Sequence, residues 1–262
     1  MVISNSTVKS LQVNSPIIDD GLVMYYDVAN PVSYQSGDSN IVDLSRSDLG
    51  GSLINSPTFN SDPLYFTGFT SNQYVGTTNT LWSTFLPTGN SDRTIICAFR
   101  TPNSFTTKNY YHILHYGSAA NRQSYGFAIW TNGGNGGIGS SNAAGVLGNH
   151  TWNGTFYADF ALQTDTDYIG AIRYRDTDSP RSSIWVAGSW RTVGFGQGES
   201  SDYSINTGTG FAPRLGNRIS TPSEPLGTDG RIYSVLFYDR FLSDNDTATV
   251  INTVSGTHGI SV

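Results

Sequence analysis

Apolar and polar residues alternate along much of this chain in short runs that end at turn-forming residues. The clearest run, 230–239, alternates like a half-buried strand and ends in a turn at Asp239 and Arg240. A second strand-like run, 21–27, lies near the start and ends in a turn at 29–31. Strands at both ends of one domain predict an antiparallel sandwich whose ends pair or lie close together.

The same pattern predicts further strands and turn-rich connections between them. A tight hairpin is expected around Gly188, a flexible tip at 133–137 continued by 140–148, and a buried strand around Cys97, whose thiol is expected in the core. The further strands are expected at 63–67, 72–76, 93–101, 109–116, 124–131, 155–162, 167–175, 182–188 and 211–216.

Only residues 243–254 are predicted to be helical. Ser243 is a good N-cap, Asp244 and Asp246 suit the first turn, and apolar residues recur on one face of the segment. Many short strands and one C-terminal helix predict an all-β fold, an antiparallel β-sandwich of the jelly-roll kind.

Composition narrows the class of protein. Of the 262 residues only 13% are charged, and the net charge of −6 is spread along the chain without a basic stripe, so nucleic acid is not an expected partner. No apolar run approaches the roughly 20 residues of a membrane span, so no membrane association is expected. The first residues do not follow the order of a signal peptide. We expect an extended arm at 1–19, with a disordered tail as the alternative, and one jelly-roll domain at 20–262.

Several blocks, in this order along the chain, resemble the concanavalin A-like, laminin-G-like jelly-roll family, and most closely its phage versions. In the loop at 43–53, Arg46, Ser47 and Asp48 replace a centre that is rich in glycine and asparagine in the family. The blocks are GLVMYYDVANP (21–31), DLSRSDLGGSL (43–53), NSPTF (55–59), YFTG (65–68), RLGNR (214–218) and GRIYSVLFYDRFLS (230–243).

The resemblance implies a non-enzymatic recognition or structural module. Together with an N-terminus that does not resemble a signal peptide, the resemblance predicts a phage virion structural protein, either a capsid decoration protein or a tail or fibre component. Such a protein would be made in the host cytoplasm and carried on the virion, and its arm would dock on other virion proteins. The alternative is a lectin or adhesin that binds surface glycans.

Aromatic residues beside loops are the candidates for glycan binding, because rings stack on sugar faces while polar groups bond the hydroxyls. Trp130 precedes the glycine-rich tip, Trp152 lies in the segment 149–154, and Trp190 follows the predicted hairpin turn. Each could instead cap the core.

No cofactor is required by this interpretation, but calcium is a candidate ligand. The family places calcium on loop carboxylates and carbonyls, which here points to Asp27, Asp43 and Asp48. Turn formation, in which the carboxylate bonds its own backbone, is the alternative. His112 and His115 lie three residues apart on a predicted strand, so their side chains should face opposite sides and should not share an ion.

Glycoside hydrolysis is not expected, although the fold hosts it. Hydrolysis needs two carboxylates that flank the sugar. Glu199 and Glu224 are isolated in loops, and the aspartate pairs 165/167 and 176/178 sit at strand ends, where such pairs are typical of turns.

Overall fold

The two clearest runs of the sequence form neighbouring strands. β1 (Leu22–Asp27) and β17 (Arg231–Tyr238) pair antiparallel, with Tyr26 opposite Val235. This pairing confirms that strands from the two ends of the chain lie side by side. The computed structural model describes residues 17–77, 79–105, 110–131, 145–151, 155–195, 204–220 and 224–262.

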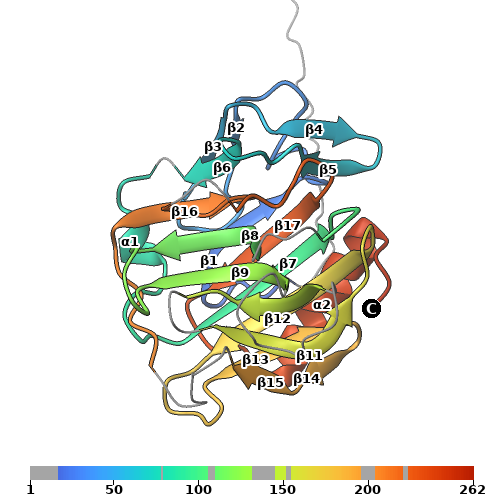
Figure 1. Ribbon diagram of the computed structural model, residues 1–262. Helices are drawn as coiled ribbons and strands as arrows, with labels where there is room; N and C mark the ends of the chain where they lie inside the picture. The colour runs from blue at the N-terminus through green and yellow to red at the C-terminus, as the bar shows by residue number, and fades with distance from the viewer. Residues whose placement is uncertain are drawn as a thin grey trace, which may run out of the picture.

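Two antiparallel sheets make a β-sandwich (Figure 1), which confirms the predicted fold class. The first sheet runs in the order β14 (Ser189–Arg191), β13 (Ser182–Val186), β12 (Asp167–Tyr174), β7 (Arg93–Arg100), β17, β5 (Leu64–Thr67) and β4 (Thr58–Ser61), with β1 also on β17. The second runs in the order β15 (Val193–Phe195), β11 (Phe156–Leu162), β10 (Gly145–Asn149), β9 (Ser124–Thr131), β8 (Tyr110–Gly117), β16 (Phe211–Leu215), β6 (Tyr74–Thr77), β3 (Gly51–Ile54) and β2 (Asn40–Ile41).

Alternate residues of both sheets form the main core. Cys97 and Phe99 of β7 meet Phe127 of β9, and the rings of Phe99 and Phe127 pack edge to face with centroids 5.8 Å apart. Cys97 is fully buried, so its thiol is a core group as expected, and burial raises its pKa well above the ordinary value.

Helix α2 (Asp244–His258) covers the outer face of the first sheet (Figure 1). Val250, Ile251 and Val254 are buried against residues of β7, β12 and β17. Ser243 Oγ accepts a hydrogen bond from the Asp246 amide at 3.1 Å, so the predicted N-cap is confirmed. The helix runs beyond the predicted end at 254. Among the described residues, no helix is long and apolar enough to cross a membrane.

The structure adds elements that the pattern of the sequence did not predict. β10 overlaps the segment that was expected to continue a flexible tip. Its five residues are instead buried, and they pair with β9 on one side and β11 on the other. Gly148 allows this approach, since a Cβ there would lie 2.4 Å from the Phe156 carbonyl oxygen. The short helix α1 (Trp82–Phe85) and strands β2, β3, β4 and β15 were also missed. The hairpin between β13 and β14 is confirmed, with positive φ at Ala187 (49°) and Gly188 (80°).

The N-terminal arm lies mostly outside the described residues, which begin at 17. Ile17 and Ile18, which the sequence placed in the arm, pack against the apolar cluster beneath α2. The docking role of the arm stays a prediction.

Candidate functional site

Trp190 lies on β14, at the edge of the first sheet, directly opposite Trp185 in the β13–β14 pair. The guanidinium carbon of Arg173, from β12, lies 3.6 Å from the centre of the Trp190 ring and 4.4 Å from that of Phe241. Burial lowers the pKa of Arg173, and the Asp244 carboxylate opposes this shift. The indole is half-buried, so Trp190 is neither a core residue nor a free surface ring.

A cleft of about 680 Å³ opens beside Trp190. Its walls combine an aromatic ring, several hydroxyl groups, two arginines and one carboxylate, and such sites fix polar ligands by a few placed polar groups. The lining residues are Arg173, Ser179, Pro180, Ser182, Ser183, Trp190, Arg191, Thr192, Val193 and Asp244.

Two polar atoms of the cleft-lining residues are buried without a hydrogen-bond partner. They are Nε of Arg173, whose Nη1 donates to Leu242 O and to Asp244 Oδ1, and Oγ of Ser182. A buried polar group without a partner costs about 1–3 kcal/mol. Both atoms are buried beneath the surface, so the polar groups that a ligand could reach are those of half-buried and exposed lining residues, such as Ser183, Arg191 and Thr192.

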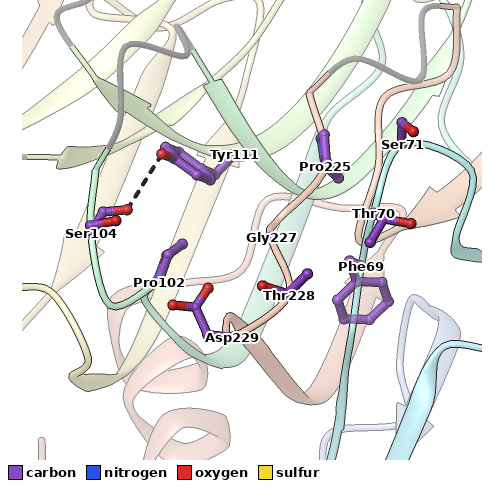
Figure 2. A pocket seen from close by; sticks show the side chains of 10 residues that line it. All are labelled: Phe69, Thr70, Ser71, Pro102, Ser104, Tyr111, Pro225, Gly227, Thr228 and Asp229. Carbon is purple, nitrogen blue, oxygen red and sulfur yellow. Dashed lines mark hydrogen bonds between the residues drawn. The ribbon is translucent and has the colours of Figure 1, made fainter.

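A second cleft, of about 420 Å³, lies where the segments 69–71, 102–104 and 225–229 meet (Figure 2). Its polar groups include Thr70, Ser104, Thr228 and Asp229, and the Asp229 carboxylate accepts a hydrogen bond from the amide of residue 103 at 2.8 Å. Tyr111 donates to Ser104 O at 3.4 Å and is 3% exposed. The aromatic rings of this cleft are thus buried, and it lacks the stacking surface of the Trp190 cleft.

Trp130 lies at the end of β9, on the face of the second sheet that points away from the core. Its ring stacks on Tyr110, with centroids 6.0 Å apart and 13° between planes, and meets Tyr157 edge-on at 5.0 Å. All three rings are half-buried. Trp130 and Trp190 therefore lie on different sheets and do not share one site, and Trp152 lies outside the described residues.

The three aspartates considered for calcium are not brought together. Among the described residues, the one group of three or more histidine, cysteine or acidic side chains close enough to hold an ion excludes them. The Asp43 carboxylate accepts from the amides of Tyr25, Ser45 and Leu49, at 2.8–2.9 Å, and from the Ser45 hydroxyl at 2.8 Å. Its oxygens thus shape the loop, as in the turn-forming alternative.

The other two aspartates have separate environments. Asp27 is buried and its Oδ1 lies 3.4 Å from Nε2 of His258, whereas Asp48 is exposed, with a φ of 51°. No shared ligand set follows from this arrangement.

The prediction that His112 and His115 face opposite sides is wrong. A β-bulge interrupts the β8–β9 pairing: His112 lies opposite Ala128 and Leu114 opposite Phe127, so Ile113 is an extra residue. Ile113 and Leu114 both point into the core, and the two histidines share the opposite face with ring centroids 4.7 Å apart. A bulge leaves no period-2 signature, so the sequence pattern could not reveal this.

No family model and no curated protein matches this sequence. Among solved structures, the chain is similar to a protein described as a receptor binding domain (TM-score 0.57, 12% identity, 90% of this chain and 52% of the other). It is also similar to the binding domain of botulinum neurotoxin DC in complex with SialylT (0.55, 13%, 90% and 52%) and to a GH54 arabinofuranosidase (0.54, 10%, 84% and 51%).

At these identities the similarities show the β-sandwich fold. The chain spans about half the length of these solved structures, 51–52%.

Proposed function

We propose that this domain binds glycans without hydrolysing them, and that the Trp190 cleft is the binding site. The observation that carries the proposal is the combination in one cleft of the half-buried Trp190 ring with hydroxyl and guanidinium groups, including those of Ser183, Arg191 and Thr192. Aromatic rings offer an apolar face to a sugar ring, and buried polar groups supply orientation.

The charge of the cleft favours acidic saccharides. Two arginines, Arg173 and Arg191, and one carboxylate, Asp244, line it. The Nε and Nη2 atoms of Arg191 donate to the carbonyls of Val186 and Ala187, so its contribution to binding is its positive charge, which would favour a sialic or uronic acid over a neutral sugar. The botulinum neurotoxin binding domain with the same sandwich fold is described in complex with SialylT, which supports this direction.

The carboxylates support binding rather than catalysis. Among the described lining residues, the Trp190 cleft has only Asp244 and the cleft of Figure 2 has only Asp229. Glycoside hydrolysis by the usual route needs two carboxyl groups flanking the bond. Solved structures with this fold include enzymes as well as binding domains, so the proposal depends on the clefts and not on the fold.

A glycan array with neutral and acidic arms tests the proposal. We expect binding to acidic glycans, a loss of at least about tenfold in affinity for Trp190→Ala, and unchanged affinity for Trp130→Ala, the matched variant on the other sheet. Melting temperatures of both variants show whether the fold is intact. If the folded protein binds no glycan of the array, glycan binding is refuted. If Trp190→Ala binds as the unmodified protein does, the Trp190 cleft is refuted as the binding site.

We also propose, from the sequence resemblance, that this domain is displayed on a virus particle. It predicts that the protein co-purifies with assembled particles, and free protein alone would contradict it.

A further inference from the structure

Three histidines meet on the face of the second sheet that points away from the core. His112 and His115 come from β8, where the bulge turns both to this side, and His150 follows β10. Their exposed fractions are 0%, 1% and 4%. His150 is held in place by its own backbone, since its amide donates to the carbonyl of Gly126 on β9 at 3.1 Å.

We propose that this three-histidine cluster, His112, His115 and His150, binds one divalent transition-metal ion, and that zinc is the best fit. One ring nitrogen from each histidine lies within 4.8 Å of the others. Zinc binds imidazole nitrogen at about 2.0–2.1 Å, which sets tetrahedral ligands about 3.3 Å apart. Small rotations of the rings therefore suffice to enclose an ion.

The hydrogen bonds of His112 prepare it as a ligand. Its Nδ1 lies 3.1 Å from the Glu224 carbonyl oxygen, which can only accept, so Nδ1 carries the proton and Nε2 keeps its lone pair. A metal-bound histidine commonly donates its other N–H in this way. The Nε2 atom points at Nδ1 of His150, 2.8 Å away. A metal ion would replace the proton between these two nitrogens, and they would separate by about 0.5 Å.

His115 supplies the independent indication of a ligand. Its Nε2 is buried without a hydrogen-bond partner. On the other side of the ring, the Ile219 amide approaches Nδ1 at 3.3 Å, a long contact. Coordination through Nε2 would give that nitrogen a partner, move the ring proton to Nδ1 and require the Ile219 contact to open.

The electrostatic environment keeps the imidazoles in the form that binds metals. Burial is the largest cause that lowers the pKa of all three, to about 3 for His112, and the charge of Arg218 lowers them further. Arg218 would repel a cation, but its Nη1 lies 2.8 Å from Glu224 Oε2, which offsets its charge.

An ion here would stabilise the segments that cover the sheet. His150 directly follows β10, and the residues 217–220 and 224–226 contribute the contacts of Glu224 and Ile219 and a parallel bridge between Pro225 and His112. The burial of the cluster favours a structural metal over a catalytic one, which would need an open position for water or substrate.

Zinc titration by calorimetry tests the site on the full chain, purified without a polyhistidine tag and stripped with EDTA. We expect one ion per chain, and a loss of affinity of about 100-fold or more for His115→Asn and for His150→Asn. His258→Asn is the matched control, because it removes the fourth and last histidine of the chain and should bind as the unmodified protein does. Absence of saturable binding, or binding unaffected by His115→Asn and His150→Asn, would overturn the proposal.

Cobalt gives a readout that needs no variant, in case the substitutions prevent folding. Co²⁺ in a site of low coordination number absorbs strongly in the visible, and Zn²⁺ should displace it and remove the band. A spectrum like that of aqueous Co²⁺ would overturn the proposal. Neither experiment depends on the Trp190 cleft, so failure here leaves the proposed glycan binding intact.

Discussion

The guanidinium of Arg173 lies over Trp190, with its central carbon 3.6 Å from the centre of the indole ring. Phe241 lies on the same guanidinium at 4.4 Å, and Nη1 donates to Leu242 O at 2.8 Å. One side chain from β12 thereby joins β14 to the chain that leads into α2. Arg173 positions the ring that we propose contacts glycans, so stability and binding should depend on it together.

Replacing Arg173 with lysine should lower the free energy of unfolding by about 1–3 kcal/mol, because an ammonium group cannot stack on Trp190 as the planar guanidinium does. Urea unfolding of both proteins measures the difference. Arg231→Lys is the matched control: Arg231 also lies over a ring, Tyr65, at 4.2 Å, but it is half-buried, so its loss should stay below about 1 kcal/mol. Equal losses in the two variants would contradict the role assigned to burial.

Arg93 should be the least replaceable cation of the core. It is fully buried, and its Nη1 donates to Tyr116 Oη at 2.8 Å and to Thr207 Oγ1 at 2.7 Å, while Nη2 and Nε donate to carbonyls, including that of Ser91. Lysine cannot reach all of these acceptors from one nitrogen. We expect Arg93→Lys to lower the free energy of unfolding by about 3 kcal/mol or more. A loss below about 1 kcal/mol in chemical denaturation would show that the acceptors find other partners.

Asp43→Asn should destabilise the domain equally with and without calcium. An amide nitrogen in place of Oδ2 would face the Leu49 amide and the Ser45 hydroxyl, both of which now donate to that oxygen. The expected loss is about 2–4 kcal/mol, the cost of two mismatched donors. Thermal melts in calcium and in EDTA measure it, and a calcium-dependent rise in the melting temperature of the unmodified protein alone would restore the calcium hypothesis.

The sequence predicts those strands in which apolar and polar residues alternate regularly, and those helix ends that follow a local capping rule. Strands β7, β9 and β12 and the cap of α2 at Ser243 lie where the pattern puts them, because each buries one face or follows a local capping rule. β10 was missed because glycines at 145 and 148 resemble a loop, although they serve the close approach of its neighbours. The local pattern of apolar and polar residues does not show how closely two neighbouring strands must approach each other.

The candidate sites were predictable only in part, for the same reason. Trp190 is identified from its place after a turn, but its partner Arg173 comes from β12, two strands earlier, and no local pattern marks the contact. The three-histidine cluster depends on one unpaired residue, Ile113, and on a third ligand from beyond β10. Nothing in the sequence spacing of 112, 115 and 150 encodes either fact.

The last prediction concerns a buried contact between a carboxylate of the first strand and a histidine of the last helix. Asp27 Oδ1 lies 3.4 Å from His258 Nε2, in the last turn of α2, where the helix dipole favours a cation. Burial raises the pKa of Asp27, but His258 and hydrogen bonds from the Ala29 amide and the Tyr25 hydroxyl, both at 2.9 Å, outweigh it, so the pKa lies below the ordinary 3.8. Among the groups that lower this pKa, His258 contributes most, first through its side-chain contact and then through its charge.

A carboxyl group whose pKa is lowered by folding stabilises the folded state above its unfolded pKa. This stabilisation is lost as the pH falls from about 3.8 through the lower pKa of the folded state. Asp27→Asn should therefore be less stable than the unmodified protein by about 1–2 kcal/mol at pH 6. The difference should shrink toward zero near pH 2, where Asp27 is itself neutral. Urea unfolding of both proteins across this range tests the prediction. A difference that stays constant with pH would mean that folding does not lower the pKa of Asp27, and would refute the prediction.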